Sequence, residues 1–266
     1  MKLTGNNDIE TIKRGLSWVE IKEAFESEGC PICYIMLKSI KKYFNSLLYE
    51  YVLDAGVHKK MIASFGLCNT HTYLLMEEEK KLHSDGLNIA ALYETSLQKE
   101  IKVIQRVNKN VRRFNKKYFT DFLKSNNELD DYKKLFHTVM NVTGKCIGCE
   151  NQKHTESYYT HEMLRLWTDE EFRELFSGGE ILLCRNHFLF LVNEAEKRET
   201  INYFVNEHIK KLDKLYSRLE EFIRKHDYRL KNEMTEDDRK SWKKLLEYFG
   251  SKKNIDREGY NDLTNA

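Results

Sequence analysis

Apolar side chains recur along this chain every three or four residues, which is the spacing of amphipathic α-helices. After Cys33 the apolar positions follow this period and stop near Asp54 to Gly56, which predicts a helix of about five turns. Similar patterns precede and follow it. The predicted helices cover residues 18–25, 34–54, 57–65, 70–81, 87–119 and 200–230.

The composition supports a helical protein. One proline and 12 glycines in 266 residues provide few of the turns that separate short strands. Hydrophobic residues make up 41% of the chain and charged residues 32%, which suits a sizeable core with a charged surface. The sequence therefore predicts an all-α fold.

All six cysteines fall into two copies of one pattern, CxxC followed by CxxH, displaced by 116 residues. We term each CxxC pair and each CxxH pair a clip. Three thiols and one imidazole form a complete tetrahedral ligand set for Zn²⁺, so the sequence predicts two zinc ions per chain. The predicted ligands are Cys30, Cys33, Cys68 and His71 in the first copy, and Cys146, Cys149, Cys184 and His187 in the second.

The constant displacement indicates two pseudo-symmetric helical repeats, each with a CxxC…CxxH metal site, followed by a C-terminal helical tail. The 34 residues between the two clips of a copy are enough for a helical hairpin, so we expect each copy to close its own site. Exchange of clips between copies is the alternative. The predicted segments are a first repeat at 1–124, a second repeat at 125–230, and a tail at 231–266 that packs on the body and frays at its end.

Two other chemistries fit the cysteines. Cys30-Pro31-Ile32-Cys33 resembles a redox dithiol, although a dithiol does not explain why both histidines keep the same register. Three thiolates and a histidine can also hold an iron–sulfur cluster. Zinc with four protein ligands has no open position for water, so the sequence favours a structural role. The alternative is an iron–sulfur, thiol-redox or metal-dependent enzyme or sensor.

Several motifs resemble an uncharacterised prokaryotic family known only as a domain of unknown function, with duplicated CPxC…GxCxxH modules and a DYR…SW tail. The motifs are Gly29-Cys30-Pro31-Ile32-Cys33, Leu47 to Val52, Gly66 to His71, Phe222 to Arg229, and Ser241-Trp242. The second CxxC lacks the proline, and Leu67 stands where phenylalanine is expected; neither departure removes a ligand. The resemblance spans nearly the whole chain and implies the architecture, but no activity.

The predicted helix 87–119 carries a stripe of basic residues. They are spaced by four, three, four and three positions, so they would lie on one face of the helix. Such a face suits an acidic protein or a nucleic acid. Opposite the stripe, Ile101, Ile104, Val111 and Phe114 can pack inward. The alternative is a solvated face neutralised by acids such as Glu77 to Glu79. The stripe consists of Lys102, Arg106, Lys109, Arg113 and Lys116.

A second candidate site lies in the tail, where Asp227, Tyr228, Arg229 and Trp242 could form a polar pocket. No phosphate-binding glycine loop, GxSxG or HExxH motif occurs, so the sequence favours a zinc-stabilised binding or scaffold protein over an enzyme. The net charge of +2 argues against bulk attraction to nucleic acid or lipid. With no apolar run long enough to cross a bilayer, we expect a cytoplasmic protein that binds no membrane.

Overall fold

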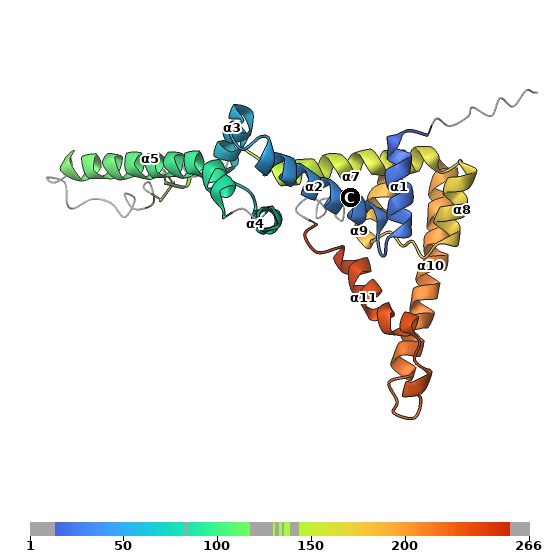
Figure 1. The fold of residues 1–266 in the computed structure, drawn as a ribbon. Helices are drawn as coiled ribbons and strands as arrows, with labels where there is room; N and C mark the ends of the chain where they lie inside the picture. Colours follow the sequence, from blue (N-terminus) through green and yellow to red (C-terminus); the bar gives the residue numbers. More distant parts are fainter. Residues whose placement is uncertain are drawn as a thin grey trace, which may run out of the picture. The chain divides into compact units, whose positions relative to one another are not determined.

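The protein is helical throughout the residues that its computed structural model describes, which are 14–82, 85–117, 130, 133–134, 136–138 and 144–255, without the side chains of 110–117 and 231. Within these residues there is no strand, which confirms the predicted all-α class. None of the described helices combines the length and the apolar character needed to cross a bilayer. The helices are α1 (Leu16–Glu26), α2 (Pro31–Tyr49), α3 (Ala55–Ser64), α4 (Asn69–Lys81), α5 (Leu87–Lys117), α7 (Ile147–Leu166), α8 (Glu170–Gly178), α9 (Arg185–Glu194), α10 (Arg198–Arg224) and α11 (Glu236–Gly250) (Figure 1).

Local sequence explains several helix starts. The one proline, Pro31, is the first residue of α2, where its missing N–H costs nothing. Asp54 and Asp169 accept a backbone hydrogen bond at the starts of α3 and α8. Thr235 and Asp238 form a capping box at the start of α11. The predicted helix 34–54 ends earlier, at Tyr49, because the chain must then turn into the cap of α3.

The helices recur in the same order as the cysteines. Pro31 plus 116 is 147, the first residue of α7, and Asn69 plus 116 is 185, the first residue of α9. Repeat-equivalent residues also meet: the hydroxyl groups of Ser39 and Thr155, which are 116 residues apart, lie 3.0 Å from each other. The starts of α2 and α4 thus recur 116 residues later as the starts of α7 and α9.

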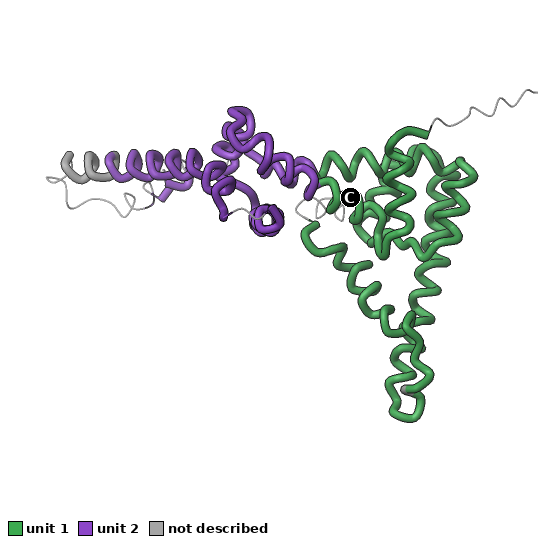
Figure 2. Tube along the Cα trace, viewed as in Figure 1, with its two compact units in different colours: residues 1–39, 152–266 green, residues 40–151 purple. Residues whose placement is uncertain are grey.

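The chain divides into two compact units that differ from the segments predicted at 1–124, 125–230 and 231–266 (Figure 2). Unit 1 comprises residues 1–39 and 152–266, and unit 2 comprises residues 40–151. The boundaries fall inside α2 and α7. The N-terminal segment groups with the C-terminal half, so a unit is not a repeat. Most of the boundary predicted near residue 124, and the end of the tail from residue 256, lie outside the described residues.

Each unit has its own core. In unit 1 the rings of Phe172 and Phe176 stack 5.7 Å apart, and Phe25 and Phe204 pack against them at centroid distances of 5.3–6.3 Å. These contacts hold α1, α8 and α10 together. In unit 2, aliphatic and aromatic side chains from α2 to α5 are buried. The hydrophobic side chains described in unit 2 that are exposed by 1% or less are Ile40, Phe44, Leu47, Leu48, Met61, Leu74, Leu75 and Leu92.

Candidate metal centres

The structure gathers the eight predicted ligands into two groups whose ligand atoms all lie within 4.8 Å of one another. Each group combines the CxxC clip of one copy with the CxxH clip of the other. Site A comprises Cys30, Cys33, Cys184 and His187, all in unit 1, and site B comprises Cys68, His71, Cys146 and Cys149, all in unit 2.

The expectation that each copy closes its own site is therefore wrong. Helix α2 carries the chain roughly 24 Å along its axis between Cys33 and Tyr49. The 10 residues of α3 make a helix of only about 15 Å, too short to bring Cys68 back to Cys33. Exchange of clips, the alternative that the sequence left open, satisfies both sites.

Site A is compact and buried. The Nδ1 atom of His187 lies 3.3 Å from the sulfurs of Cys30 and Cys33 and 3.2 Å from that of Cys184. The sulfurs of Cys33 and Cys184, separated by 151 residues in sequence, are 3.8 Å apart. All four side chains are buried. The four ligand atoms therefore surround one point.

Site B repeats this arrangement with a more open surface. The Nδ1 atom of His71 lies 3.1 Å from the sulfur of Cys68, 3.6 Å from that of Cys146 and 3.4 Å from that of Cys149. The sulfurs of Cys68 and Cys149 are 3.6 Å apart. His71 is buried, whereas the three cysteines are partly exposed. The same ring nitrogen thus faces the sulfurs in both sites.

These distances fit one tetrahedral ion. Ligand bonds of about 2.3 Å to sulfur and 2.0–2.1 Å to nitrogen place two sulfurs about 3.8 Å apart and a sulfur about 3.6 Å from the nitrogen. The observed sulfur separations are 3.6 and 3.8 Å, and the sulfur–nitrogen separations are 3.1–3.6 Å. Both groups can therefore hold a metal ion without rearrangement of the backbone.

All four clips begin a helix. Cys30 and Cys146 directly precede α2 and α7, and Cys68 and Cys184 cap α4 and α9. The second member of each clip is the third residue of its helix. The positive end of the helix dipole and the free N–H groups favour thiolate over thiol at these positions. The CxxC and CxxH spacings thus place the cysteine ligands where the backbone favours thiolate, although burial raises the pKa of the Cys30 thiol.

Polar side chains support the ligands of site A. The carboxylate of Glu156 on α7 lies 3.3 Å from the Nε2 atom of His187, on the side of the ring away from the sulfurs. The pair has no hydrogen-bond geometry, but a carboxylate this close favours the tautomer and orientation that a metal-binding histidine needs. The hydroxyl of Ser251 donates to the sulfur of Cys184 at 3.3 Å. Neither Glu156 nor Ser251 belongs to a sequence motif, so neither residue was predicted as part of a site.

Gly148 provides the space for His71 in site B. A Cβ atom at residue 148 would lie 2.5 Å from Cγ of His71 and 2.8–2.9 Å from two other ring atoms. The repeat-equivalent residue is Ile32, since 148 minus 116 is 32, and Ile32 is fully buried. The missing side chain in the second CxxC is thus a requirement of the buried imidazole.

Without a metal ion, the ligands of each site share protons. Burial alone would lower the pKa of His71, but hydrogen bonds to Cys146 and Cys68 outweigh it and raise the pKa to about 9. Hydrogen bonds from Cys149 and Cys68 lower the pKa of Cys146. In site A the pKa of His187 is likewise raised, although burial opposes the rise. A bound ion would take the place of these protons, so metal binding should release them.

His208 should make the protein sensitive to mild acid. Its ring stacks on Phe188 at a centroid distance of 3.8 Å, and burial lowers its pKa to about 4. An unfolded chain binds this proton below a pKa of about 6.5, so stability falls as pH falls from about 6.5 to 4. Between pH 7.0 and 5.5 the free energy of unfolding of His208→Phe should fall by about 1 kcal/mol less than that of the wild type, measured by urea unfolding.

The exposed His154 provides the control for this comparison. His154→Phe should lose as much stability between the two pH values as the wild type. An unchanged difference in the His208 variant would show that His208 does not carry the acid sensitivity.

The basic stripe lies on α5, where Lys102, Arg106 and Lys109 are exposed. Among the described side chains none of the three forms an ion pair. Glu78 instead accepts hydrogen bonds from Asn45 and Lys81. The side chains of Val111, Arg113, Phe114 and Lys116 lie outside the described residues. Inward packing was predicted for Ile101 and Ile104, but they are 46% and 43% exposed because α5 buries another face, which contains Leu92, Ser96 and Val107.

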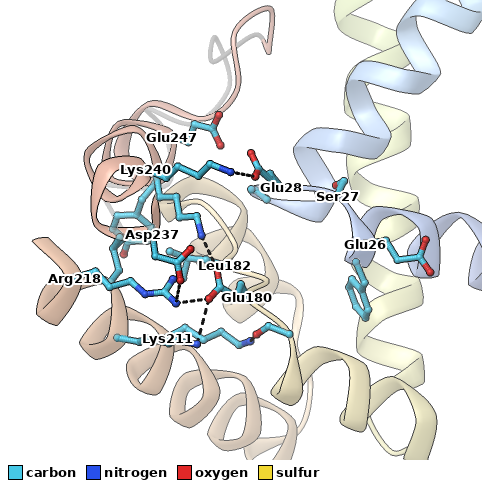
Figure 3. Close-up of a pocket in the computed structure, with 18 residues that line it drawn as sticks. Glu26, Ser27, Glu28, Glu180, Leu182, Lys211, Arg218, Asp237, Lys240 and Glu247 are labelled. Atoms are coloured by element: carbon cyan, nitrogen blue, oxygen red, sulfur yellow. Dashed lines mark hydrogen bonds and ion pairs between the residues drawn. The ribbon is translucent and has the colours of Figure 1, made fainter. Parts of the chain in front are cut away.

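The tail residues do not form an enclosed site. Arg229 forms an ion pair with Asp227 at 2.6 Å, and Tyr228 is 86% exposed. Trp242 lies on α11 and is 43% exposed. None of the four lines the cavity of unit 1 that Figure 3 shows.

That cavity, of about 290 Å³, is bordered by Cys30 of site A and by α10 and α11. Several of its charged side chains pair with one another. Arg218 donates to Asp237 at 2.8 Å, Lys244 donates to Glu180 at 2.6 Å, and Lys240 donates to Glu28 at 3.2 Å (Figure 3). The first pair joins α10 to α11, and the other two connect α11 to the loops beside site A.

Comparisons with known proteins agree with this architecture. The chain belongs to the Family of unknown function (DUF6062), whose sequence profile matches residues 12–256. The resemblance inferred from the motifs is confirmed. The chain is also similar to the "Uncharacterized 23.9 kDa protein in xynA 3'region" of Caldicellulosiruptor sp. (strain Rt8B.4), with 24% identity over 234 residues, which are 85% of this chain and 97% of the relative. No solved structure matches the chain.

Proposed function

We propose that this member of the family is a helical binding scaffold in which two zinc ions, one in each unit, have a structural role. The observation that carries the proposal is the exchange of clips. An ion in site A would connect Cys33 to Cys184 across 151 residues, and an ion in site B would connect Cys68 to Cys149 across 81 residues. Closing such long loops constrains the unfolded chain more than closing short ones.

The ligand sets support a structural rather than a catalytic ion. Three thiolates and one imidazole complete a tetrahedron and leave no position for a reacting water. The His187–Glu156 contact follows the carboxylate–histidine–metal pattern of ordered zinc sites. Paired cysteines stay reduced, and so available as thiolate ligands, in a reducing compartment. We therefore propose that the protein is cytoplasmic.

Ligand spacing favours a single ion over a cluster. An iron–sulfur cluster puts several iron and sulfide atoms between its protein ligands and therefore separates them further than one ion does. Sulfur separations of 3.6 and 3.8 Å match a single tetrahedral centre. A redox dithiol would need only Cys30 and Cys33, yet Cys184 and His187 lie within reach of both.

Elemental analysis tests the proposal. Protein purified without added metal, after removal of any affinity tag, should contain two zinc ions per chain and show no visible absorption. Its six thiols should react with a thiol reagent only after a strong chelator is added. Iron with visible absorption bands, or fewer than two metal ions per chain, would contradict the proposal.

For the binding role we propose the stripe on α5 as the contact surface for a polyanion. The observation that supports it is the exposure of Lys102, Arg106 and Lys109, together with the lack of any ion pair to them among the described side chains. Three cations on one helix face attract phosphate or carboxylate groups over about 10 Å, given a rise of about 1.5 Å per residue.

Charge reversal should weaken this binding. Lys102→Glu combined with Lys109→Glu should lower the salt concentration at which the protein elutes from heparin. Each reversal removes a lysine whose binding would release a counterion from the polyanion, and it adds a repelling negative charge. Lys153→Glu with Lys197→Glu is the matched control, since both lysines are exposed in unit 1 and the net charge changes equally. Equal elution of the two double variants would rule out the stripe as the contact surface.

A further inference from the structure

The two sites differ in their protection from solvent. All four ligands of site A are buried, and Cys33 and His187 have no exposed surface. In site B only His71 is buried, and its three cysteines are partly exposed. Site B is therefore closer to solvent than site A, which favours attack on its ion by a chelator or a competing ion.

The histidines also differ in what lies behind them. The Nε2 atom of His187 lies 3.3 Å from a carboxylate oxygen of Glu156, at ion-pair distance but without hydrogen-bond geometry. The buried Nε2 atom of His71 has neither a carboxylate at this distance nor a hydrogen-bond partner among the described residues. The repeat-equivalent of Glu156 is Ile40, since 156 minus 116 is 40, and isoleucine offers no acceptor. The ring of Phe44 packs edge-to-face with the imidazole of His71, with the two ring centroids 5.9 Å apart.

These partners matter because they hold the metal-binding nitrogen toward the ion. Loss of a carboxylate or carbonyl acceptor behind a ligating histidine typically lowers metal affinity by about 10–100-fold. Site A further receives the hydroxyl of Ser251 on the sulfur of Cys184. Both the burial of the ligands and the polar contacts therefore favour tighter retention of an ion in site A than in site B.

We propose that site B is a metal-exchange site, which takes up and releases a thiophilic divalent ion, while site A holds its ion permanently. Glu156 is the positioning residue that separates the two behaviours. The inference rests on the proposed function, namely that both sites bind a metal ion.

Release kinetics test the inference on the full-length, zinc-loaded protein. A chromophoric chelator in excess should remove one zinc ion at least 10-fold faster than the other. When one ion has left, alkylation and peptide mass spectrometry should find Cys68, Cys146 and Cys149 modified. Cys30, Cys33 and Cys184 should remain protected. Modification of the site A cysteines first, or release of both ions at one rate, would overturn the inference.

Variants of Glu156 give a second readout. Glu156→Ile, which copies the residue of the other repeat, should accelerate the slow phase by about 10–100-fold and leave the fast phase unchanged. Glu156→Gln keeps an acceptor and should accelerate it less, while the exposed Glu170→Gln should change neither phase. If Glu156→Ile does not fold, the order of alkylation in the wild type still decides. Fewer than two zinc ions before the chelator is added would instead contradict the proposed function itself.

Discussion

Removal of both metal ions should abolish cooperative folding of this protein. Metal binding at structural zinc sites of this kind contributes on the order of 10–16 kcal/mol at pH 7, and a typical domain has a net stability of about 5–15 kcal/mol. Each site joins segments that are distant in sequence, so the loss of the ions would free the N-terminal segment of unit 1 from its C-terminal half. Circular dichroism should show loss of helix and of a sharp thermal transition after treatment with a strong chelator.

Restoration by metal separates this effect from damage by the chelator. Zinc added back should recover the helical signal and the transition, and magnesium should not, because hard cations prefer oxygen ligands. An identical thermal transition before and after complete metal removal would show that the two sites do not contribute to folding.

Gly148→Ala should remove the ion of site B. The new Cβ atom would lie 2.5 Å from the imidazole of His71, a buried ring that cannot move aside and still ligate the ion. In an unobstructed helix the same substitution stabilises by about 1 kcal/mol, so the sign of the effect is diagnostic. We expect the variant to contain one zinc ion per chain instead of two and to unfold at a lower temperature.

Gly178→Ala is the matched control for this substitution. It also lies in a helix, and no atom lies within 4 Å of its added Cβ. This variant should keep two ions and be as stable as the wild type or slightly more stable. Two retained ions and a raised transition temperature in Gly148→Ala would mean that Gly148 does not make room for a ligand.

The sequence predicted the helices and the ligands because both depend on local spacing. The period of apolar residues located α3, α4 and α5 to within a few residues, and the i, i+3 clips defined the ligand types. The order of helices also followed from the constant displacement of 116 residues. These features need no knowledge of which segments lie together.

The pairing of clips could not be predicted in this way. Own-copy and exchanged sites use the same residues, and only the lengths of α2 and α3 decide between them. Glu156 contacts His187 from α7, another helix of the same copy that is distant in sequence, so no local motif marks it. The prediction of which face of α5 packs inward was also wrong. Ile101 and Val107 are both apolar, but tertiary packing buries Val107 and leaves Ile101 exposed.

The exchange of clips is the central claim, and the identity of the thiols freed by one substitution tests it most directly. Cys33→Ser should be alkylated in excess zinc and its modified residues identified by peptide mass spectrometry. We predict modification of Cys30 and Cys184 with protection of Cys68, Cys146 and Cys149. In the reciprocal Cys149→Ser variant, Cys68 and Cys146 should react. Modification of Cys30 together with Cys68 in the Cys33→Ser variant, with Cys184 protected, would contradict the exchange and return each site to its own repeat.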